Sequence, residues 1–197
     1  SLPKLKIVIS GAGAAGTAVT KLLIKAGVKD IIVLDSKGII TKGRKGLLPH
    51  KKELTKITNS RSVRGGLTEA LKGADVMIGV SGPGLMNASH VRLMALRPIV
   101  FAMANPVPEI MPEEAKRGGA AVIATGRSDY PNQVNNSLVF PGVFRGVLDS
   151  GVKRITDEIK LKAAKNLAAL VKRPTAKKII SGPFDKGVAQ AVAKAIR

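Results

Sequence analysis

The sequence of 197 residues lacks cysteine and tryptophan, and it contains only one tyrosine and four phenylalanines. Without cysteine, the chain cannot form a disulfide, a thiolate zinc site or a cysteine nucleophile. An aromatic content of 3% is too low for an RNA-binding surface of stacked rings. No apolar run is long enough to cross a bilayer, and the first residues lead directly into an expected strand instead of a cleavable leader. We therefore expect a soluble, cytoplasmic protein that does not act at a membrane.

Acidic residues are also few: 13 Asp and Glu stand against 33 Lys and Arg, which gives a formal net charge of +20. A charge of this size attracts polyanions, phosphate-bearing cofactors and acidic partners. The basic residues concentrate in segments 37–64 and 153–197. Such runs are usually solvated faces of helices and loops. An anion site in the first run and a polyanion-binding module both stay open as alternatives, but the shortage of aromatic residues argues against nucleic acid as the partner.

Short apolar runs alternate with longer amphipathic segments, a pattern typical of βαβ units around a parallel sheet. We predict an α/β fold, a doubly wound, mainly parallel Rossmann-type sheet with a C-terminal helical extension. One domain is expected over residues 1–197, with the core in about 1–150 and the extension in about 151–197. Strands are expected at 5–9, 31–34, 76–80, 99–103 and 122–124, and helices at 17–26, 51–57, 67–71, 88–95, 113–116, from 155 onward and at 188–196.

The first strand-to-helix turn carries the sequence GAGAAG at residues 11–16. Gly11 allows the tight turn, Gly13 lets the backbone approach a pyrophosphate, and Gly16 allows close packing of helix and strand. The N-terminus of the helix then offers N–H groups and a positive dipole end to the phosphates. Asp35, at the end of the second expected strand, is placed to accept a hydrogen bond from a ribose 2′-hydroxyl. These features predict a dinucleotide site, and the alternative is a glycine-rich turn that serves packing alone.

Three later loops also follow expected strands: SGPG at 81–84, ANPVP at 104–108 and TGRSDYPNQVNN at 125–136. Ligands of open α/β sheets bind at the carboxyl ends of the strands, so these loops should border one crevice. Each loop alone could be a simple turn. The three together favour ligand contact.

The segments GAGAAG, DSKGIITKGR, GVSGP, ANPVPEI, ATGRSDYPNQVNN and FPGVFRG, in this order, resemble the cofactor-binding domain of malic enzymes, especially bacterial and archaeal ones. Members of this family oxidise L-malate with NAD or NADP and decarboxylate the product to pyruvate, with a divalent metal, Mg or Mn. The resemblance implies that the dinucleotide is held by Gly11, Gly13, Ala14, Ala15, Gly16, Asp35, Ser36, Lys37, Ser81, Gly82 and Asn105. It also implies that malate is bound by Asn105, Asn135 and Asn136.

The resemblance covers only part of a family member, whose general acid, general base and acidic metal ligands precede the glycine turn. We therefore expect no catalytic residue and no metal ligand in this chain, and a missing N-terminal catalytic domain as its partner. Tyr130 belongs to a loop motif and is not assigned as the acid, while His50 and His90 are expected to be surface or helix-cap residues. The chain should bind cofactor without turnover, and the whole protein should be a homodimer. A malolactic or oxaloacetate-decarboxylating relative is the alternative.

Two features bear on the choice of cofactor in opposite directions. Asp35 favours NAD, because a carboxylate accepts from a 2′-hydroxyl and repels a 2′-phosphate. Lys37, Lys51 and Lys52 resemble a segment in which some family members bind the phosphate of NADP. We predict that both cofactors bind, with Lys37 and one of Lys51 or Lys52 assisting NADP.

Overall fold

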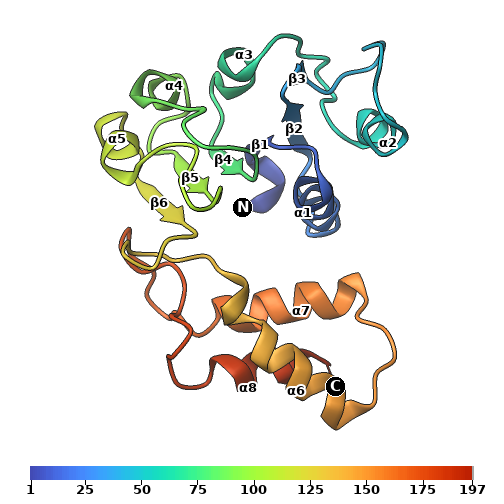
Figure 1. The fold of residues 1–197 in the computed structure, drawn as a ribbon, viewed down its shortest axis with the longest axis vertical. Coiled ribbons are helices and arrows are strands. Elements are labelled where there is room, and N and C mark those ends of the chain that lie inside the picture. The colour runs from blue at the N-terminus through green and yellow to red at the C-terminus, as the bar shows by residue number, and fades with distance from the viewer. Residues whose placement is uncertain (197) are drawn as a thin grey trace. The chain divides into compact units, whose positions relative to one another are not determined.

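The computed structural model describes residues 1–196 and divides the chain into two compact units, Ser1–Gly126 and Arg127–Arg197 (Figure 1). The sequence analysis places the change from core to helical extension near residue 150, whereas the structure places it after Gly126. The reason is helix α6 (Phe140–Ser150), which packs against α8 (Val188–Ala193) within the second unit. Across residues 1–196, no helix combines the length and the apolar character needed to span a bilayer.

The first unit contains a six-stranded sheet in the order β3-β2-β1-β4-β5-β6. All neighbouring strands run parallel except β2 and β3, which are antiparallel. This is the strand order of doubly wound dinucleotide-binding sheets, so the predicted fold class is confirmed. The sequence analysis had not expected β3, a two-residue strand in the basic loop after β2. The strands are β1 (Lys6–Ser10), β2 (Asp30–Asp35), β3 (Gly38–Ile39), β4 (Val76–Gly79), β5 (Ile99–Ala102) and β6 (Val122–Thr125).

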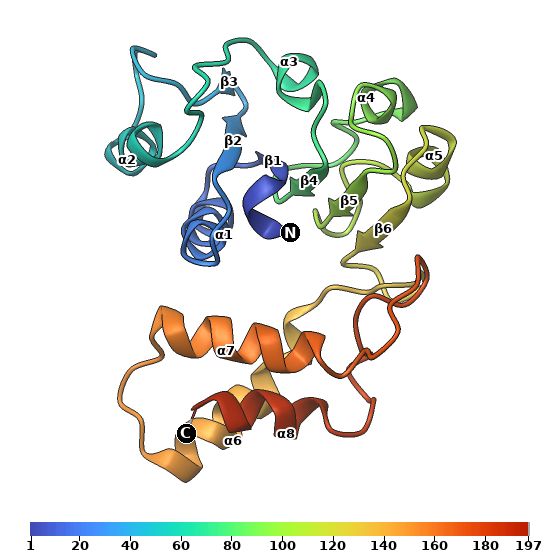
Figure 2. The same ribbon diagram turned by 180° about the vertical axis from the view of Figure 1, so that it is seen from behind.

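Helices cover both faces of this sheet, because successive strand residues point to opposite faces. Ile7 and Ile9 of β1 pack in one apolar cluster with Leu23 and Leu54, which come from helices α1 and α2. Val8 faces the other way and belongs to the cluster that contains apolar residues of α3, α4 and α5. Figure 2 shows α1 and α2 grouped apart from α3, α4 and α5. These helices are α1 (Ala14–Lys25), α2 (Pro49–Ile57), α3 (Leu67–Leu71), α4 (Ala88–Arg92) and α5 (Pro112–Arg117), after a short 3-10 turn at Leu2–Lys4.

The second unit is helical, with 3-10 turns at Asn136–Leu138 (η2) and Lys194–Ile196 (η3) and helices α6, α7 (Asp157–Ala168) and α8. The sequence analysis missed α6 because its sequence contains one proline and two glycines. Pro141 lies in the first turn, where no intrahelical N–H is lost. Gly142 and Gly146 let α6 approach α8, since an added Cβ at Gly142 would lie 2.5 Å from the Ala189 carbonyl oxygen. The helix expected from residue 155 onward ends at Ala168, and α8 starts only at Val188.

Candidate functional site

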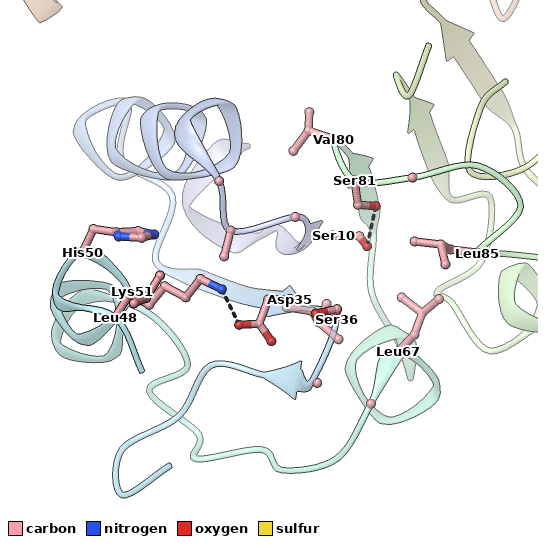
Figure 3. A pocket seen from close by; sticks show the side chains of 17 residues that line it. Ser10, Asp35, Ser36, Leu48, His50, Lys51, Leu67, Val80, Ser81 and Leu85 are labelled. Atoms are coloured by element: carbon pink, nitrogen blue, oxygen red, sulfur yellow. Dashed lines mark hydrogen bonds and ion pairs between the residues drawn. The ribbon is translucent and has the colours of Figure 1, made fainter. Parts of the chain in front are cut away.

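A cleft of about 830 Å³ lies at the carboxyl ends of β1, β2 and β4 in the first unit (Figure 3). This volume is within the range of roughly 300–1,000 Å³ usual for sites of small molecules and cofactors. The cleft lies at the point where the chain crosses from one side of β1 to the other, the topological switch at which doubly wound sheets bind ligands. Six predicted cofactor-binding residues line it: Gly11, Gly13, Asp35, Ser36, Ser81 and Gly82.

The glycines of the turn after β1 serve different purposes. Gly11 has a φ of +118°, and an added Cβ would lie 2.5 Å from the Val80 carbonyl oxygen. At Gly16 an added Cβ would overlap the carbonyl oxygen of Gly11, so both positions require glycine for packing. Gly13 differs, because the described residues beyond its chain neighbours place no atom within 4 Å of an added Cβ. Gly13 therefore borders open space in the cleft, which leaves room for a ligand against the backbone.

Helix α1 begins immediately after Gly13, so its N-terminus lies at this turn. No side chain caps the helix, and its first turn contains no acidic residue. The N–H groups of the first turn of an α-helix have no intrahelical acceptor, and the helix dipole is positive at this end. The arrangement suits a phosphate group. Ala14, Ala15 and Gly16 form this turn of helix but do not line the cleft.

Asp35 is held by two cations at the end of β2. Its Oδ1 accepts hydrogen bonds from Arg44 Nη2 at 2.6 Å and from the Lys37 backbone N–H at 2.9 Å. Its Oδ2 accepts from Lys51 Nζ at 2.7 Å, as drawn in Figure 3. Burial raises the pKa of Asp35, but the hydrogen bonds from Lys51, Arg44 and Lys37 outweigh it and lower the pKa from 3.8 to about 2. The carboxylate is therefore ionised, and with its two cations it carries a net charge of +1.

The basic residues of this region lie differently from the predicted arrangement. Lys51 lines the cleft, as predicted for one of the pair Lys51 and Lys52, whereas Lys52 is exposed and does not line it. Lys37 is exposed and reaches Asp35 only through its backbone N–H. Sequence reasoning missed Arg44, which also donates to the carbonyl oxygens of Gly38 and Ile39. Arg44 ends the segment DSKGIITKGR that begins at Asp35, but this segment alone does not show that the turn through β3 brings the two side chains together.

A second network joins the strand ends on the other side of β1. The hydroxyl oxygens of Ser10 and Ser81 lie 3.1 Å apart, as Figure 3 shows. The Ser81 N–H donates to Glu109 Oε1 at 2.9 Å, and the Ala104 N–H donates to Glu109 Oε2 at 3.0 Å. Glu109 is fully buried. Sequence reasoning missed this residue, although an acid between Pro108 and Ile110 in an otherwise apolar stretch was a usable signal.

The predicted asparagines do not line the cleft. Asn105 lies exposed in the loop after β5. Asn135 and Asn136 belong to the second unit, where the Asn135 side chain caps η2 by accepting from the Ser137 N–H at 3.0 Å. His90 lies at the start of α4, and its Nδ1 accepts from the Asn87 N–H at 3.3 Å, as expected of a cap residue. His50 lines the cleft.

The described part of the chain also bears on metal binding. Over residues 1–196, no three His, Cys, Asp or Glu side chains gather in a group that could hold a metal ion. The donor set of a divalent metal therefore does not fit the side chains of this region. We assign no chemical step to a metal held by this chain.

Comparison with known proteins places this geometry in a family. Residues 1–196 match the family described as malic enzyme, NAD binding domain. A bifunctional malic/malolactic enzyme of Bacillus subtilis is 51% identical over 100% of this chain and 48% of its own length. An NADP-dependent malic enzyme of Halomonas elongata is 45% identical over 94% of this chain and 44% of its own length. The crystal structure of an NAD-dependent malic enzyme from Thermotoga maritima superposes with a TM-score of 0.95 and 39% identity, covering 100% of this chain and 52% of that one.

The chain thus spans about half the length of the relatives that it matches. The matched family region is the one that binds the dinucleotide, and the cleft, the open Gly13 and the uncapped helix lie where a doubly wound sheet binds such a ligand. The chain belongs to the malic enzyme family, and it is similar throughout to the NAD-binding domain of that family.

Proposed function

We propose that the cleft binds NAD or NADP and that the whole protein uses it to oxidise L-malate and release pyruvate and carbon dioxide. The observation that carries this proposal is Gly13, whose backbone borders the cleft where a pyrophosphate would lie against the uncapped start of α1. A glycine that serves packing alone would have neighbours around an added Cβ, as Gly16 has. The names of the relatives, which include NAD- and NADP-dependent malic enzymes, support the same conclusion.

In this proposal the residues of the chain bind and orient, and the rest of the protein supplies acid and base. N–H groups at Gly13, Ala14 and Ala15 donate to the pyrophosphate. Asp35 and its two cations contact the adenosine ribose. When bound, the nicotinamide supplies hydride chemistry by accepting a hydride from C2 of malate. Ser81 and Gly82 line the cleft beyond the pyrophosphate and border the nicotinamide half.

Two asparagine positions are proposed to contact malate. Asn105 follows β5, and Asn136, with Asn135 beside it, begins η2. An amide donor fixes the orientation of a carboxylate without adding charge beside a metal ion. The Asn135 side-chain oxygen caps η2, which leaves its N–H₂ group able to donate to a carboxylate. On the family resemblance we assign the main carboxylate contact to Asn136, with Asn135 as a second donor.

The remaining assignments concern the rest of the protein. The family resemblance supports a separate catalytic domain that carries the acid, the base and the Mg or Mn ligands, a homodimer, and a place in the cytoplasm. A malolactic reaction is the second candidate, favoured by the name of the relative from Bacillus subtilis, a bifunctional malic/malolactic enzyme. Both reactions use the same dinucleotide cleft, so we place the choice of product in the catalytic domain.

Titration of this chain with NADH tests the proposal. We expect saturable binding at one site per chain that changes little between 0.1 and 0.3 M salt, because buried contacts are screened less than surface charges. A polyanion-binding module would instead lose affinity steeply and linearly on a logarithmic salt scale. Binding that follows the steep dependence, or no saturable binding, contradicts the proposal.

The same preparation is expected to show no malate-dependent reduction of NAD or NADP with Mg²⁺ or Mn²⁺ present. The physical reason is that the resemblance places the general acid, the general base and the metal ligands before the glycine turn. Absorbance at the wavelength of the reduced nicotinamide measures the rate, and a catalytically active relative of full length is the positive control. Turnover by this chain alone would show that its own residues carry the chemistry.

In a malic enzyme of full family length that contains this domain, Asn105→Ala and Asn136→Ala are expected to reduce kcat/KM for malate. Each loses a hydrogen bond to a charged carboxylate, which corresponds to about 1–3 kcal/mol. The Kd for NADH serves as the control and should stay constant for Asn136→Ala. An unchanged kcat/KM in Asn136→Ala would remove this residue from the malate site.

A further inference from the structure

Glu109 is a fully buried carboxylate that no cofactor or substrate assignment uses. Its Oε1 accepts from the Ser81 N–H at 2.9 Å and from the Ser81 hydroxyl at 3.3 Å. Its Oε2 accepts from the Ala104 N–H at 3.0 Å. No Lys, Arg or His among residues 1–196 forms an ion pair with it. The hydrogen-bond partners of this carboxyl group are therefore two backbone N–H groups and one hydroxyl group.

Burying a carboxyl group is costly unless its oxygens accept hydrogen bonds, as both oxygens of Glu109 do. Gly79, the last residue of β4, has no side chain and so leaves the space that this carboxyl group occupies. An added Cβ at Gly79 would overlap the carboxyl group of Glu109. Glu109 and Gly79, in different segments, thus both serve to place this buried carboxyl group.

The carboxyl group of Glu109 connects two loops that lie on the same side of β1. It joins the loop that follows β4, through Ser81, to the loop that follows β5, through Ala104. Ser81 in turn contacts Ser10 at the end of β1 through the two hydroxyl groups. The glycine turn lies on the side of β1 and β2, and so does Asp35 with Arg44 and Lys51, which together are called the Asp35 cluster. Glu109 fixes the loops on the opposite side of β1.

In a doubly wound sheet the two mononucleotide halves of a dinucleotide lie on opposite sides of the switch point. The adenosine half of the cofactor belongs with Asp35 at the end of β2. The nicotinamide half then belongs with the loops after β4 and β5, the two that Glu109 ties together. A carboxylate that accepts from both loops at once sets the distance between them.

We propose that Glu109 is a positioning residue that shapes the nicotinamide half of the cleft by holding the loops after β4 and β5 at a fixed distance from each other. The proposal rests on the proposed function, since it assumes that the cleft takes a dinucleotide. Glu109 does not line the cleft, so it acts through Ser81 and Ala104, whose N–H groups it accepts from. Replacing one of its two accepting oxygens should therefore weaken ligands that reach these loops and spare ligands that do not.

The experiment compares NADH with ADP-ribose, which lacks the nicotinamide, on the full chain and its Glu109→Gln variant. The amide keeps the size of the side chain but cannot accept from both N–H groups, so one of them is left unpaired. We expect NADH to bind at least about tenfold more weakly, and ADP-ribose to bind within about twofold of wild type. Glu114→Gln is the matched control, because Glu114 Oε1 also accepts a backbone N–H, that of Ala88 at 3.2 Å, outside the cleft. It should change neither affinity.

A second variant, Gly79→Ala, displaces the same carboxylate without changing any residue that lines the cleft. Like Glu109→Gln, it should weaken the binding of NADH and leave the binding of ADP-ribose nearly unchanged. Equal weakening of both ligands, or weakening of neither, overturns the inference, and so does loss of folding in both variants, which would make Glu109 a residue of general stability. If wild type binds neither ligand, the proposed function itself fails. If wild type binds both ligands but the variants do not weaken NADH selectively, only the proposed role of Glu109 is rejected.

Discussion

Gly13→Val is expected to raise the Kd for the dinucleotide at least about 100-fold, while the chain stays folded. The substitution adds a branched side chain to a backbone position that borders the cleft and has free space around its Cβ. Its backbone angles, φ −82° and ψ −161°, lie in the extended region that a β-branched residue adopts without strain. The new methyl groups would occupy the volume that the pyrophosphate needs, so ligand and side chain exclude each other.

The thermal midpoint separates this effect from loss of folding. Valine is a poorer N-cap than glycine, which costs about 1 kcal/mol and corresponds to a shift of about 2–4 °C in a chain of this size. Gly182→Val, in the second unit, is the matched control, because an added Cβ there meets only Asp185 at 3.6 Å. Its affinity for NADH should equal that of wild type. Undiminished binding by Gly13→Val would remove the pyrophosphate from this turn.

The contrast between Gly13 and Gly16 shows what the sequence could and could not establish. The motif predicts both glycines, and its place between a buried strand and a helix is a local signal. Only the structure separates their purposes, because the overlap at Gly16 arises from a carbonyl five residues earlier in the folded turn. A substitution at Gly16 therefore tests folding, whereas a substitution at Gly13 tests ligand binding.

Five of the six strands were predictable because each is a short apolar run between helical segments, whereas β3 has only two residues and carries no such pattern. Helix α6 was not predictable, since its proline and glycines hide the helical pattern and its packing against α8 depends on a segment about 40 residues away. Arg44 and Glu109 lie inside the segments DSKGIITKGR and ANPVPEI, but the sequence alone assigns neither of them a role. An exposed basic run or a proline-rich segment does not show which of its members will be buried.

The choice between NAD and NADP is expected to depend on Arg44 and Lys51. In the double variant Arg44→Ala/Lys51→Ala, NADP should bind about 100-fold more weakly, whereas the Kd for NAD should change by less than about threefold. A 2′-phosphate carries −1.5 to −2 charges and accepts charge-assisted hydrogen bonds from guanidinium and ammonium groups. Each such bond corresponds to about 1.5–3 kcal/mol, so the loss of two corresponds to about two to four powers of ten, and 100-fold is the lower end of this range.

The expectation for NAD follows from the state of Asp35. Its two oxygens already accept from Arg44, Lys51 and the Lys37 N–H, and its pKa of about 2 keeps it ionised. Removing the cations frees the carboxylate to accept from a 2′-hydroxyl, which compensates NAD for the lost positive charge. The same freed carboxylate repels a 2′-phosphate. Wild type should therefore bind both cofactors, whereas the variant should bind NAD in preference to NADP.

A second double variant, Lys45→Ala/Lys52→Ala, separates these contacts from the general effect of charge. Both lysines lie in the same basic segment, both are exposed, and neither lines the cleft. Removing them lowers the net charge by the same two units, so any change in NADP affinity reports only long-range attraction, which salt at 0.15 M screens beyond about 8 Å. Equal losses of NADP affinity in the two double variants would show that the segment attracts phosphate through its overall charge. A loss confined to Arg44→Ala/Lys51→Ala would place the 2′-phosphate beside Asp35, because the side chains of Arg44 and Lys51 both donate to this carboxylate at the end of β2.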